Sequence, residues 1–324
     1  MKRWIAGALA AILSAAVPIS ATAQGGYPDR PLKIIVPLPP GGSPDTIART
    51  LAQYLQETWK QPVVVENKTG GSQNIGADTV AKSAPDGYTW LLAPDNVFVT
   101  NPYLAKAADF DPLKDLAPVT LLARIQFLLV VHPSVPAKSV SELVAYAKAH
   151  PNELNFGSSG TGSPQHLGGL LLQQLSGTKM NHVPYKGAAP AVTDLLAGRI
   201  QVWIGAANSL LPHIKAERVR LLATTAPQRS PTLAETPTVA ESGVPGYSLY
   251  PWLALFVPAK TPTDIVGRIN SEVARVLNSP EVKARLVPQG MDLVTGSPAD
   301  LGALIRDEYA SWGKVIREAG LKGE

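Results

Sequence analysis

The segment LKIIVPLPPGGSPDTIARTLAQYLQETWKQPVVVEN, residues 32–67, decides the fold class. It opens with an apolar run, residues 32–37, that reads as a buried strand. A turn with paired glycines follows, and a helix is expected with Ser43 as its N-cap and Pro44 at its first position, where the missing N–H costs nothing. The helix carries an apolar stripe at helical spacing, made of Ile47, Leu51, Leu55 and Trp59. With the next strand at 63–66, this segment is a strand–helix–strand unit.

The same alternation continues along the chain. Further strands are expected at 89–92, 127–131, 154–157, 202–204 and 221–224. Further helices are expected at 77–82, 139–150, 163–175, 190–197, 262–277 and 298–319. Ser139 and Glu142 form a capping box. The last two helices begin alike, with a cap at Thr261 or Ser297 followed by a proline and an acid in the first turn. This alternation predicts mostly parallel sheets with helices on both faces, which bind ligands outside the carboxyl ends of their strands.

The first 23 residues have the pattern of a cleavable secretory signal. Lys2 and Arg3 supply a positive start, an apolar run covers residues 4–17, and Ala-Thr-Ala at 21–23 is a small-residue cleavage site. A single-pass anchor is the alternative, but the apolar run is short for a membrane span. We therefore expect an exported protein, with a soluble mature chain from residue 24.

The charges and the cysteine count exclude several classes of function. Residues 1–23 contain two basic residues and no acids, so the mature chain keeps 27 basic against 25 acidic residues. The basic residues are scattered rather than clustered, which argues against a nucleic-acid partner. The chain has no cysteine, which excludes disulfides and thiolate metal sites. A chain of about 300 residues without disulfides is expected to form two lobes, each with its own core.

A first candidate site is the turn between the first strand and its helix. Its members are Pro40, Gly41, Gly42, Ser43 and Asp45. Paired glycines let backbone N–H groups approach a ligand, and a helix start offers free donors at the positive end of the helix dipole. This pattern favours an anion site built without charged donors; a tight turn with no ligand is the alternative.

A second candidate site repeats this chemistry with more hydroxyl groups. It lies at residues 157–166, before the helix that begins near Ser163. Its candidate ligand-binding residues are Ser158, Ser159, Thr161, Gly162, Ser163 and His166. Two such loops, one from each half of the chain, are what a ligand held in a cleft would require on its two sides.

Catalytic and cofactor motifs do not fit these loops. Gln165 stands where a dinucleotide fingerprint requires a small residue, and no Gly-Lys-Ser/Thr occurs. The serine spacing does not match the Gly-x-Ser-x-Gly turn of a serine hydrolase, and no acid stands out to orient His166. The five histidines lack the spacing of metal ligands. Lys186 has no cofactor motif nearby, which favours a structural role over a Schiff base. We therefore expect no catalytic residue, no metal and no cofactor.

The order and spacing of nine short motifs resemble one family throughout the mature chain. The motifs lie at residues 27–31, 39–45, 65–68, 84–89, 157–166, 182–187, 194–198, 237–241 and 245–247. Together they resemble the substrate-binding proteins of tripartite tricarboxylate transporters, first noted as Bordetella uptake gene products. The resemblance implies a periplasmic binding protein type II fold, an α/β protein with two lobes that close on a ligand. It implies a discontinuous lobe one, 24–122 plus 250–324, and a lobe two at 123–249.

The resemblance also implies a function and partners. The ligand would be a small carboxylate gripped by both glycine-rich loops, and the partners would be the membrane components of a tripartite tricarboxylate transporter. The protein is expected to be a monomer. Asp45 is expected to hold its loop by hydrogen bonds, because a carboxylate would repel an anion.

One departure from the family pattern narrows the range of expected ligands. Many relatives carry Phe-Asp-Asn after the strand at 202–203, whereas this chain has Gly205 and Ala206 there, which we include among the ligand-binding candidates. These residues offer no counter-charge for an amine, so the expected ligand is an organic or aromatic carboxylate without an amino group. An orphan sensor that docks on a signalling partner and an exported hydrolase acting through Ser159 are the alternative functions.

Overall fold

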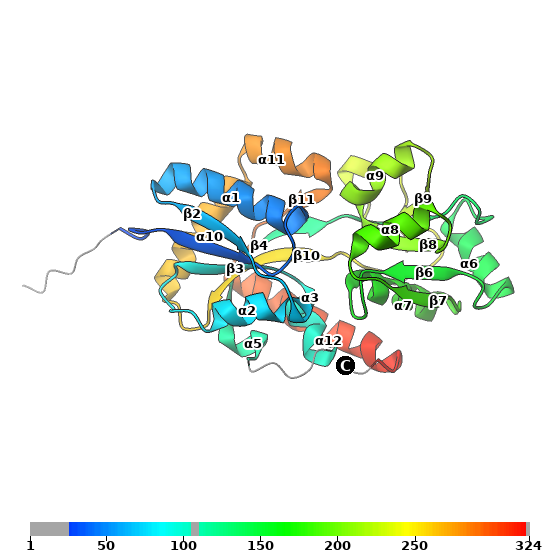
Figure 1. Ribbon diagram of the computed structural model, residues 1–324, viewed down its shortest axis with the longest axis horizontal. Helices are drawn as coiled ribbons and strands as arrows, with labels where there is room; N and C mark the ends of the chain where they lie inside the picture. Colours follow the sequence, from blue (N-terminus) through cyan, green and yellow to red (C-terminus); the bar gives the residue numbers. More distant parts are fainter. Residues whose placement is uncertain (1–25, 105–109, 322–324) are drawn as a thin grey trace, which may run out of the picture.

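The computed structural model describes residues 26–104 and 110–321, so the predicted signal peptide lies outside the described residues. Two separate β-sheets define two lobes, which lie side by side in Figure 1. Within the described residues, no helix is both long and apolar enough to cross a membrane. The predicted α/β fold with two lobes is confirmed.

Lobe one is built on a six-stranded sheet with the order β11-β4-β10-β3-β1-β2. Its strands are β1 (Leu32–Val36), β2 (Val63–Asn67), β3 (Thr89–Pro94), β4 (Leu116–Ile125), β10 (Trp252–Pro258) and β11 (Met291–Leu293). Its longer helices are α1 (Ser43–Trp59), α2 (Asn74–Ala81), α10 (Thr263–Leu277), α11 (Pro280–Leu286) and α12 (Pro298–Glu318). Short helices complete it: α3 (Asn96–Val99), α4 (Asn101–Leu104), α5 (Pro112–Asp115), and 3-10 turns at Gly71–Gln73 and Val287–Gln289.

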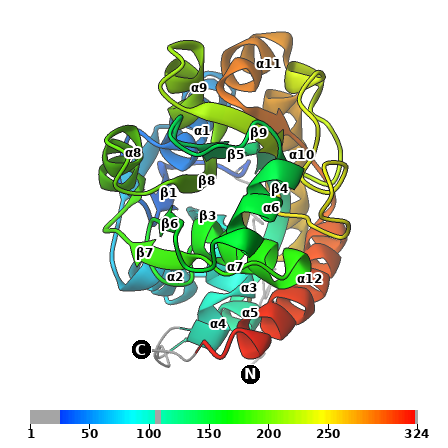
Figure 2. The ribbon, with the colours of Figure 1, turned by 90° about the vertical axis from the view of Figure 1, so that its right-hand side faces the viewer.

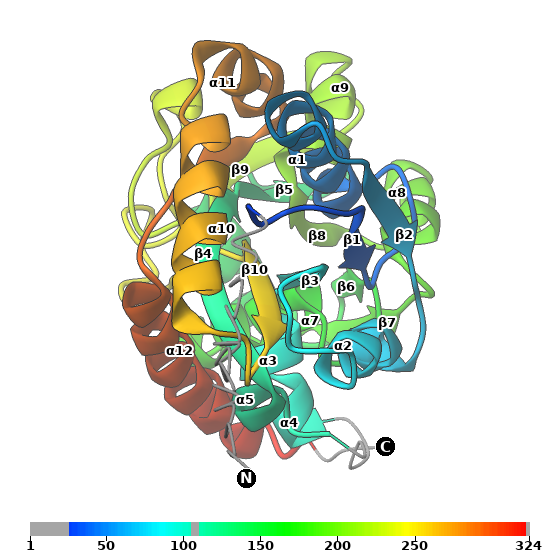
Figure 3. The same ribbon diagram turned by 90° about the vertical axis from the view of Figure 1, so that its left-hand side faces the viewer.

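Helices cover both faces of this sheet (Figure 3). Ile34 on β1 points to the core beneath α1 and α10, whereas its neighbour Ile35 points to the core beneath α2 and α12. This alternation follows from the two-residue period of a strand. It explains why the strand reads as a continuous apolar run in the sequence.

Lobe two is built on a five-stranded sheet with the order β7-β6-β8-β5-β9. Its strands are β5 (Phe127–Val131), β6 (Asn155–Ser158), β7 (Asn181–Pro184), β8 (Val202–Ala206) and β9 (Arg220–Thr224). Its helices are α6 (Val140–Ala149), α7 (Pro164–Ser176), α8 (Ala188–Leu196) and α9 (Ala207–Lys215), with a 3-10 turn at Pro231–Leu233. Figure 2 shows this lobe from its outer side.

The expectation of mostly parallel sheets is wrong. Strand β1 runs parallel to β2 and β3, and β6 runs parallel to β7 and β8. The other pairings, which involve β10, β11 and β5, are antiparallel. The reason is that β4–β5 and β10 carry the chain between the lobes in opposite directions. The parallel part of each sheet is therefore confined to the strands that end at the cleft.

The helix starts agree with the sequence in part. Ser297 accepts a hydrogen bond from the third residue of its helix, as predicted, and Ser163 does the same at the start of α7. Ser139 also caps its helix, but the Glu142 carboxylate accepts from the Lys138 N–H rather than from Ser139. These caps are local interactions, so the sequence signals them directly.

Two of the predicted caps are wrong. Gly42 has an extended backbone and is the N-cap of α1, and Ser43 is its first helical residue. The Ser43 hydroxyl accepts a hydrogen bond from Asn208. Pro262 occupies the N-cap of α10, so Thr261 lies one residue too early to cap it. In both cases the helix begins without a side-chain cap.

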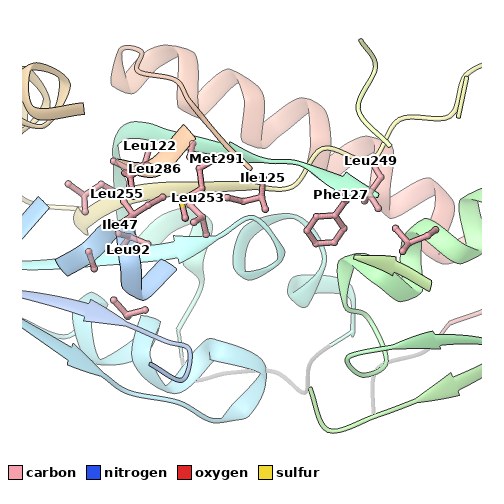
Figure 4. Close-up of a cluster of buried hydrophobic side chains, with 14 of the residues drawn as sticks. Ile47, Leu92, Leu122, Ile125, Phe127, Leu249, Leu253, Leu255, Leu286 and Met291 are labelled. Carbon is pink, nitrogen blue, oxygen red and sulfur yellow. The ribbon is translucent and has the colours of Figure 1, made fainter. Parts of the chain in front are cut away.

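Two chain crossings join the lobes. Strand β4 ends at Ile125 and β5 begins at Phe127, so Gln126 alone separates strands of different sheets. The chain returns through residues 225–251 to β10. Figure 4 shows Phe127 and Leu249 continuing a row of apolar side chains that starts in lobe one, and one buried cluster contains them all. The predicted lobe limits, 122/123 and 249/250, stay a prediction.

A partly buried network of polar side chains lies beside these crossings. Arg124 Nη1 donates to the Tyr250 carbonyl oxygen at 2.7 Å and to Glu308 Oε1 at 3.0 Å. Trp252 Nε1 donates to Glu308 Oε2 at 2.7 Å. Asp95 is buried nearby, and its carboxyl group interacts with the charges of both Glu308 and Arg124. The network therefore ties both crossings to α12.

Helix α12 also reaches lobe two. Its end lies beside α7, where the Gln174 side-chain amide donates to the Glu318 carboxylate (Figure 1). This helix belongs to lobe one, so it forms a third link between the lobes, apart from the two crossings.

Candidate functional site

A cavity of about 650 Å³ lies between the lobes. Its walls are residues 71–74, residues 159–165, and Leu38, Pro94, Asn96, Asn101 and Leu104. These segments follow the carboxyl ends of β1, β2, β3 and β6, where ligands are expected in α/β sheets. None of the lining residues is ionisable, so the polar groups facing the cavity are amides, hydroxyls and backbone groups.

The second predicted loop forms the lobe-two wall. Ser159, Thr161, Gly162 and Ser163 all line the cavity. Gly162 has a φ of +78°, and a Cβ there would lie 2.8 Å from Leu104 of lobe one. The positive φ of the turn therefore favours glycine, and a larger residue would also press on the Leu104 side chain of lobe one.

Ser158 and His166 lie behind this loop rather than in the cavity. The Ser158 hydroxyl is buried, donates to the Gly160 carbonyl oxygen at 3.1 Å and lies 2.6 Å from His182 Nε2. His166 Nδ1 accepts from the Gly162 N–H at 3.1 Å, and its ring stacks on His182 at 3.8 Å. Both residues hold the loop in shape, and ligand contact by them stays a prediction.

Burial makes His166 a neutral group. Removal from water lowers its pKa to about 4, and the neighbouring His182 adds to the effect. The folded protein therefore binds this proton less readily than the unfolded chain, whose pKa is near 6.5. Its stabilising effect is present above pH 6.5 and is lost as the pH falls towards 4.

The variant His166→Asn tests this interpretation. The wild type should lose roughly 3 kcal/mol of unfolding free energy relative to the variant between pH 7 and pH 4, because the asparagine does not titrate. The asparagine carbonyl can still accept from Gly162, and loss of the ring stack lowers stability equally at every pH. Urea unfolding at half-unit steps measures the difference, and parallel curves for the two proteins would contradict it.

The first predicted loop is stabilised mainly by Asp45. Burial alone would raise the pKa of this carboxyl, but hydrogen bonds from Arg49 and the Gly41 N–H outweigh it and lower the pKa. Both bonds measure 3.0 Å. The carboxylate thus closes the turn, in the role that the sequence suggested.

This loop reaches the cavity through Leu38. Pro40, Gly41, Gly42, Ser43 and Asp45 are not among the residues that line it. The loop meets lobe two instead, where Asn208 Nδ2 donates to the Ser43 hydroxyl at 3.3 Å. Direct ligand binding by these five residues stays a prediction.

Gly205 and Ala206 lie at the end of β8 and are also outside the cavity lining. A side chain at Gly205 would collide with the indole of Trp203. The small residue is thus explained by packing, and its role in selecting the ligand stays a prediction.

The sequence interpretation missed much of the lobe-one wall. Residues 71–74, Asn96 and Asn101 line the cavity, and Asn96 and Asn101 are also buried. The sequence did carry a signal for residues 71–74, because the Gly70-Gly71 pair follows a predicted strand, as the glycines of the other two loops do. Asn96 and Asn101 carried no local signal, since only the tertiary fold brings them to this wall.

The match to a protein-family model covers most of the chain. Residues 47–321 match the tripartite tricarboxylate transporter family receptor. The chain belongs to this family. Protein BugT of Bordetella pertussis strain Tohama I is 37% identical over 98% of this chain and 97% of its own length.

Solved structures of receptors of this family share the fold of the chain. The chain superposes on R. palustris Rpa4515 with adipate at a TM-score of 0.84 and 38% identity, covering 92% of this chain and 100% of that one. It superposes on the periplasmic binding protein BugD at 0.80 and 30% identity, covering 92% and 100%. For MatC from Rhodopseudomonas palustris with bound malate the TM-score is 0.78 at 30% identity, covering 90% and 100%. The chain is therefore a solute-binding receptor by family.

Proposed function

We propose that this receptor is a periplasmic solute-binding protein, exported by cleavage after residue 23, that captures a small organic or aromatic carboxylate. It then delivers the ligand to a tripartite tricarboxylate-type membrane transporter. The observation that carries the proposal is the cavity between the lobes, whose walls offer uncharged donors at strand ends and the start of α7. Such donors favour an anion without requiring a charged side chain.

Two further observations support the ligand class. Two of the similar structures hold adipate and malate, which are both small carboxylates. No carboxylate side chain lines the cavity, so an ammonium group on the ligand would find no counter-charge among the lining residues. An acid without an amino group fits this lining better than an amino acid.

The contacts around Ser159 support binding rather than ester hydrolysis. Its hydroxyl donates to Gln165 Oε1 at 2.9 Å, whereas the neighbouring His166 is engaged with Gly162 and His182. A serine nucleophile requires a base at its hydroxyl. The hydroxyl is instead placed beside the cavity as a polar contact.

A melting-temperature screen of the mature chain against small carboxylic acids tests the function. A ligand at a hundredfold excess over its Kd should add about 2.7 kcal/mol to the free energy of unfolding and raise the melting temperature. A screen of organic and aromatic acids in which no acid raises the melting temperature would overturn the proposed function.

The variant Thr161→Val tests the site itself. This side chain lines the cavity, and its hydroxyl has no hydrogen-bond partner among the described residues. Removing a hydroxyl that binds a carboxylate should weaken the best acid about tenfold or more, as measured by calorimetry. Thr193→Val is the matched control, because Thr193 is exposed on α8 and bonds only to its own helix. Equal affinities in both variants would remove Thr161 from the site.

A further inference from the structure

A second cavity lies within lobe one, between α5 and α12 (Figure 3). This lobe-one cavity has a volume of about 350 Å³, near the lower end of the roughly 300–1,000 Å³ that is usual for small-molecule sites. Ten residues from α3, α5, β4, β10 and α12 line it. None of them lines the cavity between the lobes, so the two cavities are separate.

Most of the lobe-one cavity is apolar. Its floor includes Phe98 and Phe256, which are buried and stack with ring centroids 3.9 Å apart. One wall is the Tyr309 ring, which stacks on Tyr103 at 4.5 Å, and the Tyr103 hydroxyl donates to the Tyr309 carbonyl oxygen at 3.1 Å. Leu113 at the rim is 41% exposed. Covering this leucine with an apolar ligand would be favourable, and the stacked rings hold the cavity in shape beforehand.

The rim of the lobe-one cavity carries a single charge. Arg306 is the only lining residue with a charged side chain, and it forms no hydrogen bond or ion pair with any residue that the structure describes. A Cβ at Gly302, one turn earlier on α12, would lie 3.6 Å from Arg306 Nη1, so the guanidinium lies over this part of the cavity. Asp111 and Asp115, at the two ends of α5, do not line the cavity, and Asp111 pairs with Lys114 at 2.9 Å. A guanidinium without an acidic partner favours an anionic ligand.

We propose that the lobe-one cavity is a second binding site, which takes a small amphiphilic anion. The apolar tail of the ligand packs against Leu113 and the aromatic floor, and its anionic head binds the Arg306 guanidinium. Burial of the tail supplies affinity, whereas the arginine selects an anion over a cation. This inference does not rest on the function proposed for the cavity between the lobes, because no residue is common to the two sites.

Calorimetry with two probes of equal chain length tests the charge preference. Octanoate and octylamine share their apolar tail and carry a carboxylate and an ammonium group at its end. We expect the mature chain to bind octanoate at least about fivefold more tightly, on the scale of a partly exposed ion pair. Equal binding of the two probes, or no binding of octanoate, would overturn the proposal.

The variant Gly302→Leu tests the location of the site. A Cβ there would lie 3.6 Å from Arg306 Nη1 and 3.9 Å from Pro118 Cγ, so the new side chain starts at ordinary contact distance and points into the cavity. Leucine is also a better helix former than glycine, so the melting temperature should not fall. Octanoate binding at this site should be lost, whereas any octanoate bound between the lobes should remain.

Gly267→Leu is the matched control for this variant. Gly267 also lies in a helix of lobe one, α10, and a Cβ there would have no neighbour within 4 Å. The control should bind octanoate as the wild type does. Octanoate binding that is the same in Gly302→Leu and in Gly267→Leu would show that the lobe-one cavity is not the site.

The variant Arg306→Gln separates the charge from the shape of the cavity. Arg306 is exposed, so this protein should fold even if the leucine variant does not. Octanoate should bind about fivefold more weakly, while octylamine should bind no more weakly than to the wild type. Arg268→Gln is the control, because it removes an exposed arginine of α10 that does not line the cavity. Equal octanoate affinities in the two variants would contradict the role of Arg306 and the proposal with it.

Discussion

Replacing Arg124 by methionine should lower the free energy of unfolding by roughly 2–3 kcal/mol, which is less than the cost of breaking a fully buried ion pair and more than that of breaking a surface pair. Arg124 and Glu308 are only 19% and 22% exposed. Without the guanidinium, Glu308 and the fully buried Asp95 would lie close together without their shared cation. Urea unfolding at pH 7.5 measures the loss.

A surface pair provides the control for this variant. Arg30 and Asp86 also form an ion pair, but they are 57% and 38% exposed. Arg30→Met should therefore cost no more than about 1 kcal/mol. The double variant Arg124→Met with Glu308→Gln should recover part of the loss, because it removes one of the unpaired charges. Similar losses for Arg124→Met and Arg30→Met would show that the network at the crossings does not depend on buried charge.

Asp95→Asn should remove a loss of stability that the wild type undergoes as the pH rises. Burial and the nearby Glu308 raise the pKa of Asp95 from 3.8 to about 7, against the bonds from the Asn96 and Trp252 N–H groups and the charge of Arg124. The folded protein therefore binds this proton more tightly than the unfolded chain. The stability that results is fully present below pH 4 and is lost as the pH rises to 7.

The size of the effect follows from the shift of about three pKa units. At roughly 1.4 kcal/mol per unit, the wild type should lose about 4 kcal/mol relative to Asp95→Asn between pH 4 and pH 8. The asparagine carbonyl can still accept from the Asn96 N–H, which measures 2.7 Å to Asp95 Oδ1. Unfolding free energies that fall in step for both proteins across this range would show that Asp95 is not the group responsible. Asp95 makes the wild type less stable as the pH rises, whereas His166 makes it less stable as the pH falls. The two variants therefore report separate groups.

The parts of the site that depend on local sequence could be predicted. The turn before α7 is signalled by its glycines, its hydroxyls and the Ser163 cap, and it lines the cavity as expected. The strand–helix–strand unit at 32–67 is equally local, and its strands and helix lie where the apolar pattern placed them. In these segments, neighbouring residues decide the conformation.

The parts of the site and of the fold that depend on long-range contacts could not be predicted from the sequence. Ser72 and Gln73 have no intrinsic preference for the left-handed region, so nothing in the sequence announces the turn that places Gln73 in the cavity. Arg124 and Glu308 are separated by 184 residues, and only the folded chain makes them partners. The first glycine loop is a different case, because its local chemistry suggested a ligand but could not show that Ser43 would accept a hydrogen bond from Asn208 in lobe two.

The contact between α7 and α12 makes the receptor suitable as an optical sensor. Gln174 and Glu318 lie on different lobes yet hydrogen-bond to each other, so this junction should respond to any change in the lobe arrangement. The chain has no cysteine of its own, so a cysteine introduced at Gln174 would be the sole thiol available to a fluorescent dye. We expect the emission of such a dye to report a change in the lobe arrangement without a coupled assay.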